Sequence, residues 1–207
     1  MISGGYAYVN KNRSGYLLTR GSNSPKLRKG PGWYESAVLH LSPHTSAEAG
    51  VNLCPWSSEG CRTSCLNTAG RGRMHIAQNA RRHRTMMFAQ HKPVFLDDLN
   101  RELENLKGRA SKSGWKKPVA RLNGTSDIAW EKYLVPQLHE TIQFWDYTKV
   151  WYRMERLFRG DFPSNYHLTY SRSEDTRDSR IDEVIENNFN VAVVFDTPKT
   201  KALPTEW

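Results

Sequence analysis

Short apolar segments alternate with helical segments along most of this 207-residue chain, and this alternation limits the possible folds more than any other feature. Each apolar segment is bounded by turn-forming residues, as buried strands are. The clearest helix is predicted over 94–110, where leucine and phenylalanine recur at helical spacing. Strands that alternate with helices form parallel βα units. The predicted strands are 36–41, 118–122, 143–149, 166–170 and 190–195.

Further helices are predicted over 74–90, over 127–142 with a bend near Pro136, over 150–158 and around 181–188. Together these elements predict an α/β protein with a partial or complete (β/α) TIM-barrel-like fold. Residues 1–36 are rich in Gly, Ser, Asn, Pro and Lys, which predicts an irregular or hairpin-forming N-terminal lead-in. Residues 37–207 are predicted to form a single barrel-like domain.

Polar residues capable of chemistry follow each predicted strand. The carboxyl ends of parallel strands share one face, where ligands bind. Asn, Asp, Ser and Thr are also common helix caps and turn residues, and charged residues there often form structural ion pairs. The candidates for catalysis are Asp127, Asp146, Lys149 and Arg172. The candidates for cofactor binding are Asn123, Gly124, Thr125 and Ser126.

All three cysteines of the chain lie in one loop, 53–73, which follows the first predicted core strand and would lie over that face. Cys54, Cys61 and Cys65 have the spacing C-x6-C-x3-C. Three thiolates without a fourth cysteine fit a [4Fe-4S] cluster with one iron open, or a zinc ion completed by histidine. Zinc sites usually contain C-x2-C turns, which are absent here, so the cluster is favoured.

Zinc nevertheless remains an alternative metal, with four histidines able to complete the site, and a purely structural role for the cysteines is a third interpretation. An odd number of cysteines in a chain without a secretion signal argues against a disulfide framework. The four histidines are His40, His44, His75 and His83.

The net charge is +9 and the sequence pI is about 9.6. Such a charge favours nucleic acid or phosphorylated small molecules as partners, although a solvated basic surface explains it equally well. Many of the basic residues are arginines within 71–84, on or just after the cysteine loop. No apolar run approaches the roughly 18 residues of a membrane span. We therefore expect no membrane partner and a cytoplasmic protein; the oligomeric state is not predicted.

Several motifs together resemble a family of tailed-bacteriophage proteins, the gene product 88 type: NLCPWSSEGC, CLNTAGRGR, VARLNGTSDIAWE, WDYTK and NYHLTYSRSE. The resemblance covers about 41–195. It implies a phage origin and action in the cytoplasm of the infected bacterial host, but no particular reaction. Members of this family tend to continue past the position of Trp207, so we expect a last element of the sheet to be missing or supplied otherwise.

The predicted placement of a three-cysteine loop after the first strand of a partial barrel is also similar to that of radical S-adenosylmethionine enzymes. This similarity implies S-adenosylmethionine as a second cofactor, with Gly124 beside it. The spacing differs from the C-x3-C-x2-C of those enzymes, and no GGE sequence is present.

The leading hypothesis is a phage iron–sulfur protein, as a cluster-dependent enzyme acting on a small molecule or a nucleic-acid component. The alternative is a nucleic-acid-binding protein whose loop is stabilised by zinc or a cluster. A third class is an electron-transfer or redox-sensing protein.

Overall fold

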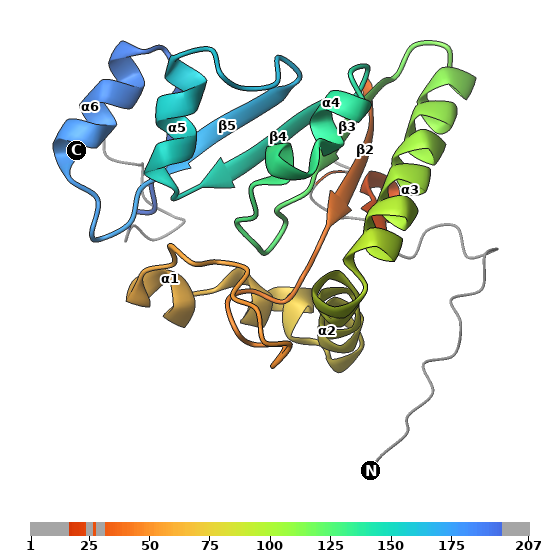
Figure 1. The fold of residues 1–207 in the computed structure, drawn as a ribbon, viewed down its shortest axis with the longest axis horizontal. Coiled ribbons are helices and arrows are strands. Elements are labelled where there is room, and N and C mark those ends of the chain that lie inside the picture. The colour runs from red at the N-terminus through yellow and green to blue at the C-terminus, as the bar shows by residue number, and fades with distance from the viewer. Residues whose placement is uncertain (1–16, 24–26, 28–31, 196–207) are drawn as a thin grey trace.

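A computed structural model describes residues 17–23, 27 and 32–195 of the chain, and shows a mixed α/β fold built on one sheet (Figure 1). The six strands lie side by side in the order of the sequence. The first pair is antiparallel and the other four pairs are parallel. The strands are β1 (Leu18–Arg20), β2 (Tyr34–Leu39), β3 (Lys117–Arg121), β4 (Gln143–Thr148), β5 (Tyr166–Ser171) and β6 (Asn190–Ala192).

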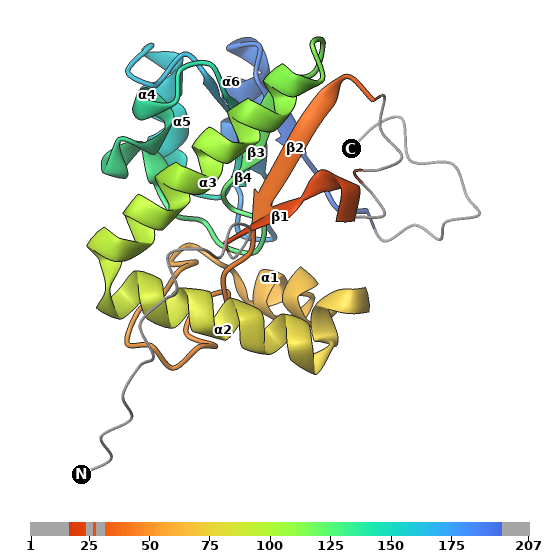
Figure 2. The ribbon, with the colours of Figure 1, turned by 90° about the vertical axis from the view of Figure 1, so that its right-hand side faces the viewer.

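The helices that connect the parallel strands cover one face of the sheet (Figure 2). Right-handed crossovers between strands that follow one another in order place every connecting helix on the same side. The sheet residues that face these helices, among them Leu39, Ala120, Phe144 and Leu168, are fully buried in the core. The helices are α3 (Lys92–Lys112), α4 (Val135–Leu138), α5 (Trp151–Phe158) and α6 (Asp178–Glu186).

A separate helical segment lies beyond the carboxyl ends of the strands, below the arrowhead of β2 in Figure 1. It contains the whole cysteine loop and joins β2 to α3. Phe88 at the end of this segment packs edge-on against Phe95 and Trp130, which anchors the segment to the core. Its elements are α1 (Glu59–Thr63), η3 (Leu66–Thr68), η4 (Gly70–Arg73) and α2 (His75–Gln90).

The structure confirms the α/β class and the mostly parallel sheet. All five predicted strands are present, with β6 ending earlier than expected, and the helices predicted over 74–90 and 94–110 correspond to α2 and α3. Among the described residues the sheet does not close on itself, because β1 and β6 are its two edges. The barrel-like part of the prediction is therefore not shown.

The prediction of a helix over 127–142 is wrong. That stretch contains only a 3-10 turn, η5 (Trp130–Tyr133), and the single turn of α4. Leu134 between them has a φ of 59°, a left-handed conformation that ends a helix. Upstream, the backbone at Ile128 is held by the side chain of Asn123, which competes with helical hydrogen bonding.

The predicted N-terminal lead-in contributes to the sheet where it is described. β1 lies inside the range 1–36 and pairs with β2, which itself begins within that range at Tyr34. The remainder of the lead-in at 1–16, 24–26 and 28–31 lies outside the described residues, as does the end of the predicted domain at 196–207. The division into two regions stays a prediction.

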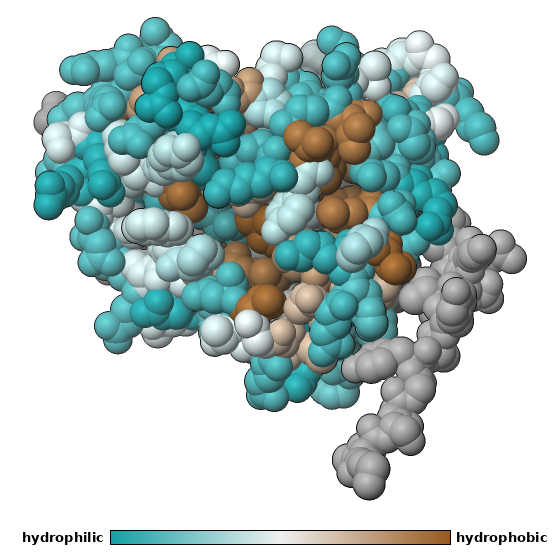
Figure 3. All heavy atoms as spheres, in the orientation of Figure 1, coloured by the Kyte–Doolittle hydropathy of each residue, from teal (hydrophilic) through white to brown (hydrophobic). Residues whose placement is uncertain are grey.

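The helix-covered side of the molecule is mostly hydrophilic, with hydrophobic residues gathered in a strip that runs down from α4 (Figure 3). Leu134, which precedes α4, and Leu138, which ends it, are both exposed. No helix in the described part of the chain is long and apolar enough to cross a membrane.

Candidate functional site

The carboxyl ends of the strands face the cysteine loop, and a residue that follows β5 fixes the start of α1. The Oε2 of Glu174 accepts a hydrogen bond from Ser58 Oγ at 2.7 Å, and its Oε1 accepts one from the backbone N–H of Gly60 at 2.6 Å. A Cβ atom at position 60 would lie 2.9 Å from that Oε1, so glycine permits the contact. Ser58 in turn caps α1 by accepting from the backbone N–H of Cys61.

The second half of the loop is held by two side chains of α2. Gln78 Nε2 donates to the carbonyl oxygens of Asn67 at 2.5 Å and Gly72 at 2.6 Å. Arg81 Nη1 donates to Asn67 Oδ1 at 2.6 Å. Asn67 and Arg81 are both buried, so η3 and η4 are fixed on α2 and Cys65, which precedes η3, is fixed with them.

The three thiols are free, half-buried and close enough to one another to interact electrostatically. Burial raises the pKa of Cys54 to about 12, and Asp127 and the other two thiols add to this effect. Burial also raises the pKa of Cys61, although the nearby Lys149 ammonium opposes it. Without a bound cation, Cys54 and Cys61 are therefore protonated thiols at neutral pH.

Two predicted catalytic residues, Asp127 and Lys149, act electrostatically on the cysteines. Lys149 is the one that carries positive charge. It directly follows β4, and its Nζ donates to Ser171 Oγ at 2.8 Å at the end of β5. Its charge acts on Cys61, as noted above. Lys149 and Ser171 thus bring a flexible cation and a hydroxyl to the edge of the cysteine loop.

The four predicted cofactor-binding residues form the loop after β3, and their side chains shape that loop. Asn123 Oδ1 accepts hydrogen bonds from Ser126 Oγ, from the Ile128 backbone and from an indole N–H. Thr125 Oγ1 donates to Leu41 O at 2.5 Å. The backbone oxygen of Thr125 faces the site, where it accepts from Cys54 Sγ at 3.8 Å. A role of these residues in cofactor binding stays a prediction.

Gly124 brings the loop after β3 against the end of β2. Its N–H donates to Leu39 O at 3.0 Å, and a Cβ atom there would lie 2.6 Å from that oxygen and 2.8 Å from His40 Cδ2. Any side chain at position 124 would push the two strand ends apart.

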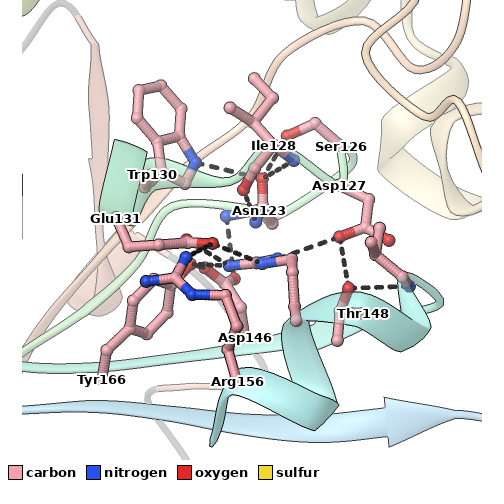
Figure 4. A network of polar contacts seen from close by, with 12 residues as sticks. Asn123, Ser126, Asp127, Ile128, Trp130, Glu131, Asp146, Thr148, Arg156 and Tyr166 are labelled. Carbon is pink, nitrogen blue, oxygen red and sulfur yellow. Dashed lines mark hydrogen bonds and ion pairs between the residues drawn. The ribbon is translucent and has the colours of Figure 1, made fainter. Parts of the chain in front are cut away.

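A network of buried charges lies next to the loop after β3 (Figure 4). At its centre is Arg153 of α5, which is 2% exposed. Its guanidinium binds Glu131 through Nε at 3.1 Å and Nη2 at 2.9 Å, and contacts Asp127 at 3.2 Å and the Tyr166 hydroxyl at 3.2 Å. Asp127 also accepts from Thr148 Oγ1 and from a backbone N–H, both at 2.9 Å.

Asp146 belongs to the same network and is 1% exposed. It accepts hydrogen bonds from the Asn123 backbone at 2.8 Å and from the Tyr166 hydroxyl at 2.7 Å, and Arg121 Nε lies 3.6 Å away. Burial raises the pKa of Asp146 to about 6. The structure thus places Asp127 and Asp146 among internal partners, and the predicted catalytic roles of both stay untested.

The remaining basic candidates do not lie together. Arg172 Nη2 bonds Asp178 Oδ1 at 2.9 Å, in the first turn of α6. The basic residues of α2 divide by exposure: Arg82 is exposed and pairs with Glu48, whereas Arg81 is buried. Within residues 17–23, 27 and 32–195, no group of three or more His, Cys, Asp and Glu side chains is arranged to hold a single metal ion.

Sequence reasoning missed the central role of Arg153 and Glu131. A signal for Arg153 was present, since it lies in the segment WYRMERLF among large apolar residues, where a charged side chain needs an internal partner. Nothing local identifies Glu131, 22 residues earlier, as that partner.

Comparison with protein families finds a match. The family described as gene product 88 matches residues 16–207, which include the cysteine loop and every described strand and helix. No curated protein and no solved structure matches the chain, so the similarity to radical S-adenosylmethionine enzymes receives no support from these comparisons. The match covers almost the entire sequence, and the chain belongs to the gene product 88 family, a bacteriophage family.

Proposed function

We propose that this phage protein binds a [4Fe-4S] cluster through Cys54, Cys61 and Cys65, with one iron open toward the carboxyl ends of the strands. The observation that carries the proposal is the gathering of all three thiols at this end of the sheet, close enough to interact electrostatically. Parallel α/β proteins bind their ligands at this end. Three cysteines leave the fourth iron of such a cluster to another ligand.

The chemistry of the thiols supports a metal-loaded state. A bound cation displaces the proton of a thiol, and buried thiols such as Cys54 and Cys61 otherwise remain neutral. A cluster attaches each thiolate to a different iron, so its ligands need not surround a single point. Glu174, Gln78 and Arg81 fix the loop from outside and hold the thiols in place.

The further proposal is a cluster-dependent enzyme that acts on a small molecule or a nucleic-acid component in the cytoplasm of the infected bacterium. The open iron is suited to a chelating cofactor, of which S-adenosylmethionine is one, and the cluster would supply an electron. Lys149 and Ser171 are the polar groups placed to orient a ligand beside Cys61. The same proposal includes a partial (β/α) barrel as the fold that carries this site.

The test is anaerobic reconstitution with iron and sulfide. Wild type is expected to take up about four irons per chain, whereas Cys54→Ser, Cys61→Ser and Cys65→Ser each lose most of the bound iron. Ser64→Ala is the matched control, because Ser64 lies next to Cys65 and bonds only within α1. Full iron uptake by any of the three cysteine variants would remove that cysteine from the proposed ligand set.

Nucleic-acid binding is the second candidate, with zinc or the cluster holding the loop. The net charge of +9 and the exposed arginines Arg71, Arg73 and Arg82 beside the cysteine loop favour it. Binding to single- or double-stranded DNA should then weaken steeply with salt, by roughly 10³-fold or more between 50 and 200 mM for six or more phosphate contacts. Affinity that is unaffected by salt would argue for the enzyme instead.

A further inference from the structure

The connecting helices lie on one face of the sheet (Figure 2), and a groove of about 920 Å³ opens on the other. Side chains alternate between the two faces of a strand, so Phe144 is buried against the helices whereas its neighbour Trp145 lines the groove. His167 lies directly opposite Trp145 and continues the same face on β5. The groove also extends around the amino ends of β4 and β5, where residues 162–164 line it. It is thus separate from the cysteine loop, which lies beyond the carboxyl ends of the strands.

Aromatic side chains from several elements line this groove. Tyr34 begins β2 and is 48% exposed, and Trp145 and His167 lie on β4 and β5. Phe162 and Phe189 line the groove just before β5 and β6. From β2 to β5 the rings span three strand spacings, about 14 Å in all. They are therefore spread along a surface rather than gathered at one point.

Lysines accompany the rings on this face. Lys116 lines the groove. Lys117 is exposed and lies opposite Tyr34 in the pairing of β2 with β3. Among the described residues that line the groove, the acidic one is Glu35, which forms an ion pair with Arg109 Nε at 3.0 Å. The lining residues therefore present an excess of positive charge to a ligand.

The central strands combine rings with a further cation. Arg121 at the end of β3 places its guanidinium over the rings of Trp145 and Tyr147, at 5.2 and 4.8 Å from the centroids. These two rings meet edge-on with their centroids 6.1 Å apart. The exposed His167 has its Nε2 at 3.2 Å from Asn190 Nδ2. Such contacts orient the side chains before a ligand binds, which lowers the entropic cost of binding.

We propose that this face of the sheet binds single-stranded nucleic acid, with bases stacked on the aromatic side chains and phosphates bound by the cations beside them. The stacking residues are Tyr34, Trp145 and His167. The cations are Lys116, Lys117 and Arg121.

Single strands suit this surface better than a duplex does. The bases of a duplex are stacked on one another, whereas unpaired bases can stack on aromatic rings and guanidinium planes. Stacking tolerates any sequence, because every base has a π-face. The net charge of +9 complements a phosphate backbone. An acidic peptide would match the cations but would make no use of the row of rings.

This surface goes beyond the proposed cluster, because it needs no metal. It rests on the second candidate function for the class of ligand alone. That candidate used the exposed arginines beside the cysteine loop, whereas the present inference places the strand on another face and requires unpaired bases.

The test is fluorescence anisotropy of labelled 12-nucleotide single strands, one of DNA and one of RNA, titrated with the full chain at low salt. The DNA duplex of the same sequence is measured in parallel, and each titration is repeated after treatment with a chelator. We expect wild type to bind at least one of the single strands tenfold or more tightly than the duplex, with and without metal. A duplex bound as tightly as both single strands would overturn the proposal, even where no variant folds.

Tyr34→Ala is expected to weaken binding of the single strand by about 5- to 100-fold, because it removes one stacked base. Tyr152→Ala is the matched control, since Tyr152 is 55% exposed on α5, on the helix-covered side, and should bind as wild type does. Lys117→Gln should reduce the slope of log Kd against log salt by about one phosphate contact. Equal binding by Tyr34→Ala and Tyr152→Ala would overturn the proposal.

Arg82→Gln distinguishes the two nucleic-acid surfaces. Weaker binding by Arg82→Gln together with unchanged binding by Tyr34→Ala would place the nucleic acid beside the cysteine loop, which supports the second candidate function and overturns this inference. The reverse result supports the sheet face. Binding that persists after chelation keeps this inference independent of the cluster proposal.

Discussion

The buried network around Arg153 and the cysteine loop differ in how their charged and titratable groups are paired. Around Arg153 every charge meets an internal partner: two carboxylates, a hydroxyl and backbone groups. In the cysteine loop three thiols lie together with one ammonium group nearby, and Arg81 bonds only neutral oxygens. The first region satisfies its charges within the protein, whereas in the second region the proposed cluster would be the partner of the thiols.

This contrast distinguishes polar groups that stabilise the fold from polar groups that are available to a ligand. Buried charges that satisfy one another hold elements together, here α5, β4 and β5 with the turn at η5. Buried polar groups that lack partners mark binding sites more often than they stabilise a fold. The predictions below probe this contrast, from the largest effect to the smallest.

Replacement of Arg153 should have the largest effect. Arg153→Leu leaves Asp127 without this cation and leaves Glu131 with only the more distant Arg156 Nη1, 3.9 Å away. We expect a loss of about 3–5 kcal/mol in the free energy of unfolding. Chemical denaturation followed by circular dichroism measures it. A loss below about 1 kcal/mol would show that the network is not the structural centre that its geometry indicates.

Asp146 should make stability depend on pH. Its pKa is about 6 in the folded protein and about 3.9 in an unfolded chain, so the folded state holds the proton more tightly. The stability contributed by protonation is therefore lost as pH rises from about 4 to about 6. Asp146→Asn stays neutral, so its free energy of unfolding should rise relative to wild type by up to about 3 kcal/mol across that window. A difference between the two proteins that is constant with pH would contradict this assignment.

Removal of bound metal should lower the stability of the protein more than removal of a thiol from the metal-free chain does. In chelator-treated protein, Cys54→Ala is expected to cost about 1 kcal/mol or less, since it deletes one half-buried sulfur with a weak hydrogen bond. Chelation of loaded wild type should lower Tm by several degrees, because the metal binds only the folded loop. Both values come from the same thermal scans. A Cys54→Ala loss as large as that of Arg153→Leu would make the thiol structural.

Replacement of Arg82 should change the free energy of unfolding least. Arg82 forms an exposed ion pair with Glu48, at 3.1 Å, and pairs of that kind contribute roughly 0–1 kcal/mol. Arg82→Gln should leave metal content unchanged and alter the free energy of unfolding by less than about 0.5 kcal/mol. A change in metal content would contradict this prediction, because it would show that the exposed Arg82 pair affects metal binding by the cysteine loop.

Local sequence patterns were sufficient for the five parallel strands and for the long helices. The spacing of leucines in 94–110 and the short apolar runs before Asn123 and Ser171 follow from periodicity alone, since each element buries one face. The stretch 127–142 could not be assigned in this way. Its conformation depends on the side chain of Asn123 and on the left-handed Leu134, and both override helix propensity.

The end of the sheet that carries the candidate residues was predicted, but the contacts among those residues were not. Strand order implies that Lys149 and the cysteines share one end of the sheet, and the structure places them together. The partner of Arg153 and the burial of Arg81 beside an exposed Arg82 depend on packing between distant segments, which no local pattern encodes. The division of charged residues into those paired inside the protein and those exposed at its surface therefore required the structure.

The central claim is that the cysteine loop holds a four-iron cluster, and the most direct measurement is the metal and sulfide content of protein purified without oxygen, with its visible absorption spectrum. We predict about four irons and four sulfides per chain and a broad band near roughly 400 nm, as for a cluster of this ligation. A colourless protein with one zinc per chain, or one that takes up neither metal, would contradict the claim.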